Sequence, residues 1–441
     1  MKSAEFSRRR KRLMQMMGKA AVAILPAAPT RTRNRDAEYA YRQDSDFHYL
    51  TGFNEPESVL VLIPKRKHGE VILFCRERDP VMETWHGRRA GLEGAMEHYG
   101  ADDAFPITDI DDILPGLLES SERVYYAMGS DTLFDQRVTG WVNRLKEQSR
   151  AGVHTPKEFV ALDHLLHDMR LYKSRAEIGA MRKAAKVSAQ AHIRAMQTCQ
   201  PGKMEFEIEA EFQHHFKQHD FENAYTPIVG GGENGCILHY TENNAELLDG
   251  DLLLIDAGAE NELYAADITR TFPVNGRFNP EQKALYQLVL DAQLAAIEKI
   301  KPGNHWNEPH KAAVRVLTKG LIKLGLLKGK LPALIKEQAY RVFYMHRTGH
   351  WLGLDVHDVG DYKVGDAWRQ LEPGMVLTVE PGLYIAPGSK VGGRVVAKKW
   401  QGIGIRIEDD VLVTKDGYEV LSKDAPKTVV EIETLMAKAT S

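Results

Sequence analysis

The chain has 441 residues, of which 27% are charged and 43% hydrophobic; it is therefore neither disordered nor fibrous, and it is longer than one hydrophobic core usually supports. The 58 Lys and Arg residues nearly balance the 61 Asp and Glu residues, and the net charge of −3 gives no electrostatic basis for binding nucleic acid or an anionic membrane. Three scattered cysteines cannot build a disulfide framework, and no apolar run approaches the roughly 20 residues that span a bilayer, so we expect a two-domain cytoplasmic protein.

Residues 1–173 are predicted to form a smaller N-terminal α/β domain. A first helix should lead into a buried strand at residues 20–25. Three further stretches, at 58–63, 70–74 and 123–127, are rich in the β-branched and aromatic residues typical of strands. No group of residues in this domain forms a pattern that requires a catalytic or metal site, so we expect the domain to serve in assembly and substrate access.

Residues 174–441 are predicted to form the second domain. Ser174 and Glu177 match a capping box and open a long helical pattern that stops before Pro201. Asn279 and Pro280 supply the cap and first-turn proline of another helix. The order of elements over both domains predicts the α/β (α+β) class.

The second domain contains an internal echo. Residues 249–258 and 373–382 share a glycine, an apolar run, an acid and a closing glycine, and Asp256 falls on Glu380. This similarity predicts two related halves, each delivering one acid at the end of a strand.

Four acids stand in or beside apolar, strand-like runs, where acids are least expected. Asp256 ends one run, and Asp267 lies in a second run eleven positions later. A turn at residues 260–261 would pair the two runs as a hairpin and bring these acids together. Glu380 and Glu408 repeat the arrangement. Any one acid by itself could simply be a turn residue or the partner of an arginine.

Four carboxylates cannot be buried together as anions, and divalent metal would compensate their charge. His350 offers a nitrogen ligand, and such an oxygen-rich set suits Mn²⁺ or Co²⁺. Two ions held about 3.5–4 Å apart by shared carboxylates can hydrolyse an acyl bond. His239, His346 and His357 are further candidates, although a lone histidine is often structural.

A competing motif is weak. Residues 230–235 satisfy G-x-G-x-x-G, but the following residues 236–241 are β-like instead of a helix start, which argues against a dinucleotide site. The sequence also lacks a P-loop, an H-E-x-x-H pair and a G-x-S-x-G elbow.

The ordered acids and histidine resemble the metal ligands of the pita-bread metallopeptidases. They stand in the contexts Ile-Asp-Ala-Gly, Asp-Ile-Thr-Arg-Thr-Phe, Gly-His-Trp-Leu-Gly, Val-Glu-Pro-Gly and Arg-Ile-Glu-Asp. Within that family the chain is most similar to the aminopeptidases P, or Xaa-Pro aminopeptidases, and residues 41–47 and 51–56 extend the resemblance into the first domain. The resemblance implies a pita-bread second domain with an internal pseudo-twofold repeat.

The family implies an aminopeptidase with two divalent ions, most often Mn²⁺, with Co²⁺ or Zn²⁺ possible. A hydroxide bridging the ions would cleave the bond before a proline in second position, and the family is expected to form homotetramers. By resemblance, Asp256 and Glu408 would contact both ions, Asp267 would chelate one, and His350 and Glu380 would complete the shell of the other.

The resemblance also assigns catalytic and substrate-binding roles. Glu380 is the expected proton acceptor, and Arg406 the expected partner of a ligand carboxylate. The residues expected at the substrate are His239, His346, His357, Tyr384 and Trp85, of which His239 and His357 would also stabilise the tetrahedral intermediate. Trp85 would reach the active site of a neighbouring subunit.

Two alternatives remain open at this point. A prolidase shares the ligands but cuts Xaa-Pro dipeptides, and a non-catalytic member would bind peptides without cleaving them, although no ligand is missing here. One departure from the family is that Arg347 and Thr348 stand where relatives have smaller or apolar residues, so the pocket lining should differ.

Overall fold

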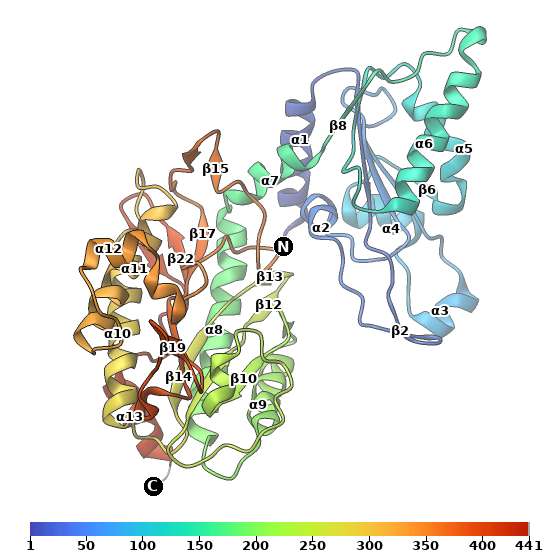
Figure 1. Ribbon diagram of the computed structural model, residues 1–441. Coiled ribbons are helices and arrows are strands. Elements are labelled where there is room, and N and C mark those ends of the chain that lie inside the picture. The colour runs from blue at the N-terminus through green and yellow to red at the C-terminus, as the bar shows by residue number, and fades with distance from the viewer. Residues whose placement is uncertain (440–441) are drawn as a thin grey trace. The chain divides into compact units, whose positions relative to one another are not determined.

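The computed structural model describes residues 1–439, and the chain divides into two compact units, residues 1–170 and the residues from 171 onward (Figure 1). The fold is mixed α/β, as predicted from the order of elements. Among the described residues, no helix combines the length and apolar character needed to cross a bilayer.

The first unit is built on a mixed six-stranded sheet in the order β6-β5-β4-β1-β7-β8. The predicted strands are present as β1, β4, β5 and β7, and the first helix as α1. The strands are β1 (Ala21–Pro26), β4 (Val59–Leu62), β5 (Val71–Cys75), β6 (Asp103–Pro106), β7 (Arg123–Tyr125) and β8 (Glu158–Val160), with a small hairpin of β2 (Thr32–Asn34) and β3 (Ala37–Glu38).

Helices cover both faces of this sheet (Figure 1). Alternate strand residues such as Val22 and Phe74 form one core with apolar residues of two of these helices, α5 and α6. Between these two helices, the Trp141 indole N–H donates to Asp111 at 2.7 Å. The helices are α1 (Ser3–Met17), α2 (Ser45–Thr51), α3 (Pro80–His86), α4 (Gly91–Tyr99), α5 (Ile110–Leu118), α6 (Thr132–Glu147) and α7 (Asp163–Leu171), with short 3₁₀ turns η1 (Ile107–Asp109) and η2 (Ser149–Ala151).

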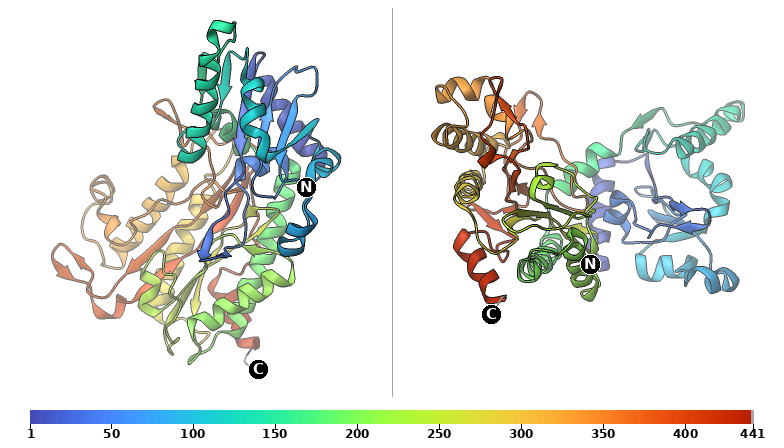
Figure 2. Two further views of the ribbon diagram at one scale, coloured as in Figure 1. Left: turned by 90° about the vertical axis from the view of Figure 1, so that its right-hand side faces the viewer. Right: turned by 60° about the horizontal axis from the view of Figure 1, so that its bottom comes forward.

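The helices of the second unit begin where the sequence places them. Ser174 and Glu177 form the predicted capping box of α8, and Asn279 caps α10 in the same way. The α-helices are α8 (Arg175–Thr198), α9 (Glu205–Gln218), α10 (Pro280–Ile297), α11 (Asn307–Lys323), α12 (Leu331–Lys336) and α13 (Val429–Ala439), with 3₁₀ turns η3 (Gly232–Cys236), η4 (Ala339–Val342) and η5 (Lys398–Trp400). Figure 2 shows the green α8–α9 pair and the yellow-to-orange α10–α11 pair on different sides of the strands.

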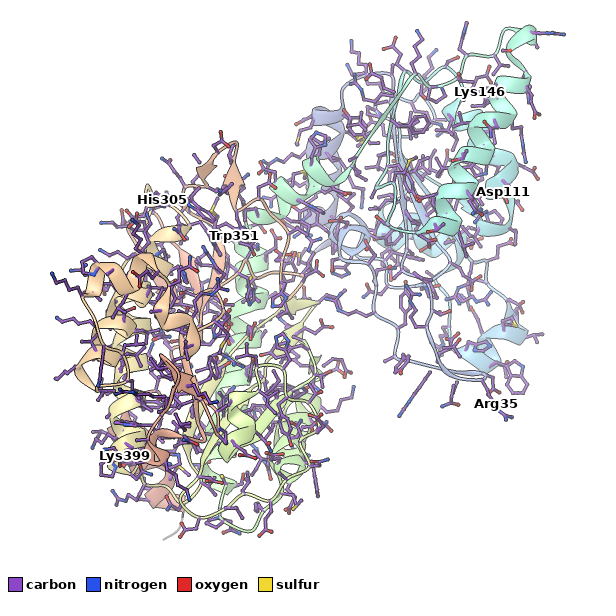
Figure 3. The ribbon with its side chains drawn as sticks, in the orientation of Figure 1. Arg35, Asp111, Lys146, His305, Trp351 and Lys399 are labelled. Atoms are coloured by element: carbon purple, nitrogen blue, oxygen red, sulfur yellow. The ribbon has the colours of Figure 1, made fainter. Side chains whose placement is uncertain are left out.

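The strands of the second unit form several small antiparallel sheets around one large apolar core, in which Trp351 is fully buried (Figure 3). The sheets are β10-β11-β14, β13-β12-β9, β17-β22-β23 and β18-β21, with hairpins β15-β16 and β19-β20. Their bounds are β9 (Glu222–Asn223), β10 (Ile228–Gly231), β11 (Leu252–Asp256), β12 (Ala259–Asn261), β13 (Tyr264–Ala265), β14 (Thr269–Pro273), β15 (Lys363–Val364), β16 (Ala367–Trp368), β17 (Val376–Val379), β18 (Gly382–Ile385), β19 (Lys390–Val391), β20 (Arg394–Val395), β21 (Ile403–Arg406), β22 (Asp409–Val413) and β23 (Tyr418–Val420).

The internal echo of the sequence reappears in the strands. β11 pairs antiparallel with β14, and β17 pairs antiparallel with β22. In each pair one acid ends or follows the first strand and the other precedes the second strand: Asp256 and Asp267 in one pair, Glu380 and Glu408 in the other. The repeated arrangement sets the four acids at corresponding strand ends.

Two local expectations were wrong. The turn expected at residues 260–261 lies two residues later, at Glu262 and Leu263, both with positive φ, because residues 259–261 extend as β12 and pair with β13. The segment 237–241, expected to be β-like, forms no strand and follows η3 as an irregular loop. No helix follows the glycine motif, as predicted, because η3 is a short 3₁₀ helix that lies largely within the motif and residues 237–241 are irregular.

Candidate metal centre and active site

The antiparallel pairing delivers the acids to one place. β11 pairs with β14 in a register that sets Asp256 opposite Thr269, two residues after Asp267. Gly258 permits the close approach of the connecting backbone, because a β-carbon there would lie 1.8 Å from the carbonyl oxygen of Ala266. The glycine two positions after Asp256 in the sequence therefore has a steric reason.

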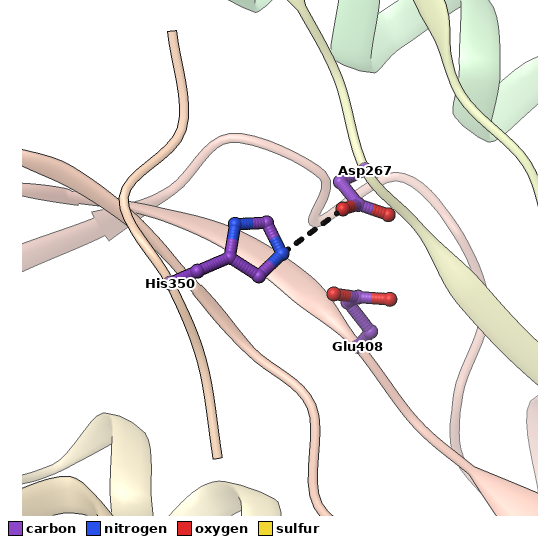
Figure 4. Close-up of side chains that lie close together, drawn as sticks. All are labelled: Asp267, His350 and Glu408. Atoms are coloured by element: carbon purple, nitrogen blue, oxygen red, sulfur yellow. Dashed lines mark ion pairs between the residues drawn. The ribbon is translucent and has the colours of Figure 1, made fainter. Parts of the chain in front are cut away.

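Three of the predicted ligands converge closely (Figure 4). His350 Nε2 lies 3.3 Å from Asp267 Oδ2 and 3.9 Å from Glu380 Oε1. Asp267, His350 and Glu408 each offer a ligand atom, and these atoms lie within 4.8 Å of one another. The Nδ1 atom of His350 lies 2.9 Å from the carbonyl oxygen of Trp351, and this contact orients Nε2 toward the acids.

Asp256, the fourth acid, is linked to the cluster by the hydroxyl group of Tyr225, a residue that the sequence did not single out. The Tyr225 hydroxyl lies 2.6 Å from Asp256 Oδ1 and 2.7 Å from Asp267 Oδ1, so it joins the two carboxyl groups. Tyr225 lies three residues before β10, whose Ile228 pairs with Asp256. Only knowledge of the β10–β11 register could have identified Tyr225 as a residue of the site.

Burial makes this cluster electrostatically costly. It raises the pKa of Glu408 well above its usual range and that of Glu380 to about 7, and it also raises the pKa of Asp256. For Asp267, burial is outweighed by the hydrogen bond and charge of His350, so its pKa is lowered. The same contact overcomes burial at His350 and raises its pKa to about 9.

These residues fit a site for divalent cations. Buried carboxylates whose pKa values rise together lack compensating positive charge, and an oxygen-rich donor set with one imidazole is the kind that hard and borderline divalent ions take. The two ions implied by the sequence would provide that charge.

Arg406 ties the acids to the surrounding residues. Its guanidinium donates to Asp256 Oδ2 at 2.6 Å, to the Tyr384 hydroxyl at 3.0 Å and to Thr269 Oγ1 at 3.1 Å. Thr269 in turn donates to Glu408 Oε2 at 2.7 Å. Arg406 thus pairs with the carboxylate of one predicted ligand, Asp256, as the family resemblance implied.

The predicted histidines surround the cluster. The His357 ring packs edge-on against His350 with centroids 4.3 Å apart, and His239 and His357 are both exposed. His346 Nε2 lies 2.9 Å from the Tyr384 hydroxyl, and its Nδ1 lies 3.6 Å from Glu380 Oε2. Burial lowers the pKa of His346 to about 3, so this ring stays neutral.

A cavity of about 960 Å³ opens onto these residues. Its walls include residues that the sequence did not single out as functional, three of them aromatic. The lining is Leu238, His239, Asp256, Asp267, Trp306, His346, Arg347, Gly349, His350, His357, Asp361, Tyr362, Lys363, Trp368, Glu380, Arg406 and Glu408. The volume accommodates several residues of a peptide.

Two predicted substrate residues are not among those that line the cavity. Tyr384 is buried, and its hydroxyl contacts Arg406 and His346. Trp85 lies in the first unit, on α3, a helix with no buried residue, and its side chain is 77% exposed. Its predicted role across a subunit interface stays a prediction.

Family models match both units. Residues 179–415 match metallopeptidase family M24, and residues 6–125 match the N-terminal domain of aminopeptidase P. The chain is 47% identical to an Xaa-Pro aminopeptidase of Escherichia coli, over 99% of this chain and 98% of that protein, and 44% identical to one of Haemophilus influenzae, over 98% and 97%.

Solved structures agree over the whole length. An aminopeptidase of Pseudomonas aeruginosa superposes with a TM-score of 0.98 at 61% identity, covering 100% of this chain and 99% of that one. A variant of E. coli aminopeptidase P, solved in complex with substrate, superposes with a TM-score of 0.96 at 47% identity, with coverage of 100% and 99%.

Proposed function

The chain belongs to metallopeptidase family M24, and from that membership we propose that it is a dinuclear-metal aminopeptidase, which removes the first residue from peptides with proline in second position. The observation that carries this proposal is the convergence of four carboxyl groups, two buried and two partly buried, and His350 on one cavity. The sequence similarity to Xaa-Pro aminopeptidases, which extends over nearly the whole chain, supports peptides with proline in second position as the substrate class.

We propose two Mn²⁺ ions as the native metals, with Co²⁺ or Zn²⁺ as substitutes. Asp256, Asp267, His350, Glu380 and Glu408 would hold them. Asp267 lies beside His350 and shares the Tyr225 hydroxyl with Asp256, which places these would-be ligands next to one another.

A pair of such ions polarises a peptide carbonyl and makes water a nucleophile near neutral pH. The chain's own residues do the rest. Glu380 accepts the proton from the attacking water at a carboxylate oxygen, and His239 and His357 face the cavity to hold the substrate and the developing oxyanion. Arg406 favours the ionised form of Asp256 against the effect of burial and holds this carboxyl group in place.

The proposed function is tested by substrate length and metal dependence. Protein stripped of metal and reloaded with Mn²⁺ should release alanine from Ala-Pro-Ala, and not from Ala-Ala-Ala, as followed by mass spectrometry. A prolidase would cleave only the dipeptide Ala-Pro, and a non-catalytic peptide-binding protein would bind the tripeptide without cleaving it. No Mn²⁺-dependent release from any Xaa-Pro peptide refutes the proposal.

Replacing His357 by Ala should lower kcat by roughly 10²–10⁴-fold, because the substrate loses a hydrogen-bond donor while the ligands stay intact. Metal content, measured by plasma mass spectrometry, should equal that of the wild type. Loss of both ions in His357→Ala would instead make His357 a ligand or a support of His350.

We propose a homotetramer in the cytoplasm, in which the first unit serves assembly and substrate access and Trp85 enters a neighbouring subunit's active site. The exposure of Trp85 on α3 supports this. Residues 1–173 would form that domain and residues 174–441 the catalytic one.

Trp85→Ala should leave the free energy of unfolding within about 0.5 kcal/mol of wild type, since the side chain is exposed, yet lower kcat/KM about tenfold. Assemblies mixed from Trp85→Ala and Asp267→Asn subunits should regain activity, because a complete site then takes its ligands from one subunit and Trp85 from the other. Val81→Ala, on the same exposed helix, is the control. Failure of the mixed assemblies to regain activity would place Trp85 outside the neighbour's site.

A further inference from the structure

The cavity has a wall that the mechanism does not use. Trp368 lines it, and two cations lie over its indole ring: the Arg347 guanidinium carbon 5.2 Å and Lys363 Nζ 4.8 Å from the ring centroid. Lys363 and Trp368 are paired residues of the β15–β16 hairpin, so the strand register holds this cation against the ring. We call Arg347, Lys363 and Trp368 the cationic rim.

The cationic rim lies where the cavity meets solvent. Arg347 and Lys363 are exposed, whereas Asp267 and Glu408 at the metal centre are buried. Arg347 donates to Asn307 at 2.7 Å, and no ion pair is recorded for Arg347 or Lys363 within residues 1–439. Apart from the four acids of the metal centre, the described lining of the cavity has one carboxylate, Asp361, so at the rim two cations stand against one anion and the local charge is positive.

The direction of a bound peptide follows from the reaction. This step rests on the proposed function. An aminopeptidase that releases one residue keeps that residue inside the site, and everything after the cleaved bond extends outward, so the part of the substrate that meets an exposed rim is the part after proline. A carboxylate is the peptide group that an arginine and a lysine bind together, and the Trp368 ring holds both cations in place for it.

We propose that the cationic rim is a subsite for a carboxylate on the residue after proline. That carboxylate can come from two sources: the free C-terminus of an Xaa-Pro-Yaa tripeptide, or an acidic side chain at the third position of a longer peptide. The subsite would make the enzyme prefer short or acidic peptides through a lower KM.

Two substrate pairs measure this preference on the Mn²⁺-loaded protein. The first pair is Ala-Pro-Ala with a free C-terminus and its C-terminal amide. The second pair is Ala-Pro-Glu-Ala amide and Ala-Pro-Gln-Ala amide. The carboxylate member should have a kcat/KM higher by about 3–10-fold, mostly through KM, and the preference should shrink as NaCl is raised from about 0.05 to 0.5 M. If kcat/KM is higher for the carboxylate member of only one pair, that pair identifies whether the cationic rim binds the C-terminal carboxylate or the acidic side chain.

Lys363→Met and Arg347→Met should each bring the ratio of the two kcat/KM values toward one. Lys363 is exposed on a hairpin, so its replacement is the variant that tests the rim even if Arg347→Met disturbs Asn307 or the fold. Lys390→Met is the matched control, because Lys390 is exposed on the other small hairpin, β19–β20, does not line the cavity and should keep the wild-type ratio.

The possible failures are distinguishable. Equal kcat/KM values within both pairs for the wild type, or wild-type ratios in both Lys363→Met and Arg347→Met, overturn the cationic rim as a carboxylate subsite and leave the peptidase standing. Absence of hydrolysis of every Xaa-Pro peptide overturns the proposed function and the subsite with it.

Discussion

Asp267→Asn is expected to abolish turnover, with kcat lowered at least about 10³-fold and at least one of the two ions lost. Asp267 lies beside His350, is bonded by Tyr225 and offers a ligand atom alongside Glu408. The substitution keeps the size of the side chain but removes the negative charge that holds a cation.

The effect on stability should depend on metal, which makes the test specific. In the metal-free protein, Asn loses the charge contact with His350 but relieves repulsion from the neighbouring acids, so Tm should not fall by more than a few degrees. In the wild type, Mn²⁺ at a hundred times its Kd should stabilise the fold by about 2.7 kcal/mol, and Asp267→Asn should lose most of that gain. Plasma mass spectrometry, kcat and Tm with and without Mn²⁺ measure the three effects.

Asp366→Asn, in the exposed turn between β15 and β16, is the matched control and should keep metal content and the Mn²⁺-induced rise in Tm. An Asp267→Asn protein that turns over like the wild type would refute the placement of the metal centre.

The acids of the site were predictable because they violate a local rule. Asp256 ends the apolar strand β11, and its counterpart in the internal echo, Glu380, directly follows the apolar strand β17, so the anomaly occurs twice in one chain. Strand pairing then needs only short-range turns to bring Asp256 and Asp267 together. Their positions follow from pattern and connectivity, without knowledge of the rest of the fold.

The loop after the glycine motif was not predictable in this way. Residues 236–241 have the composition of a strand, but a β-carbon on Gly404 of β21 would lie 2.0 Å from the Gly235 carbonyl oxygen. The backbone of η3 therefore packs directly on β21, and the chain turns there instead of extending. A contact between residues about 170 positions apart overrides local propensity.

The supporting polar groups were missed for the same reason. Tyr225 contacts Asp256 and Asp267, which lie 31 and 42 residues later in the sequence. Trp368 packs against Arg347, from which it is separated by a loop and the first strand of a hairpin. No local pattern marks a tyrosine or tryptophan as one that will face a site. Side chains that act through tertiary contacts become visible only when the strand register is known.

A buried ionic network behind β22 gives the second large effect. Asp409 is fully buried and accepts hydrogen bonds from Arg270 at 2.7 Å, from Ser422 at 2.7 Å, and from Gln293 and Lys427 at 2.6 Å each. Arg270, also fully buried, donates to the carbonyl oxygen of Glu408 at 2.6 Å. The network thus fixes the backbone that presents a metal ligand.

Asp409→Ala should lower the free energy of unfolding by about 3–5 kcal/mol, because it leaves the Arg270 guanidinium buried without its anion. Burial opposes ionisation, but Arg270 and Lys427 hold the pKa of Asp409 well below its usual range. A carboxylate with a depressed pKa stabilises the fold above its unfolded pKa, roughly 3.9, and that contribution is lost as pH falls below it. Wild-type stability should therefore drop more steeply in acid than that of Asp409→Ala.

Urea unfolding from about pH 3 to 7 measures both effects. Asp416→Ala, at an exposed turn between β22 and β23, is the control and should stay within about 0.5 kcal/mol of the wild type. A smaller substitution separates fold from function: Ser422→Ala removes one of the four donors to Asp409 while leaving both cations paired, so it should cost about 1 kcal/mol and keep Glu408 in place. Equal losses in Asp409→Ala and Ser422→Ala would show that the paired charges contribute nothing beyond an ordinary hydrogen bond, and that Arg270 does not need its anion to hold β22 at the metal centre.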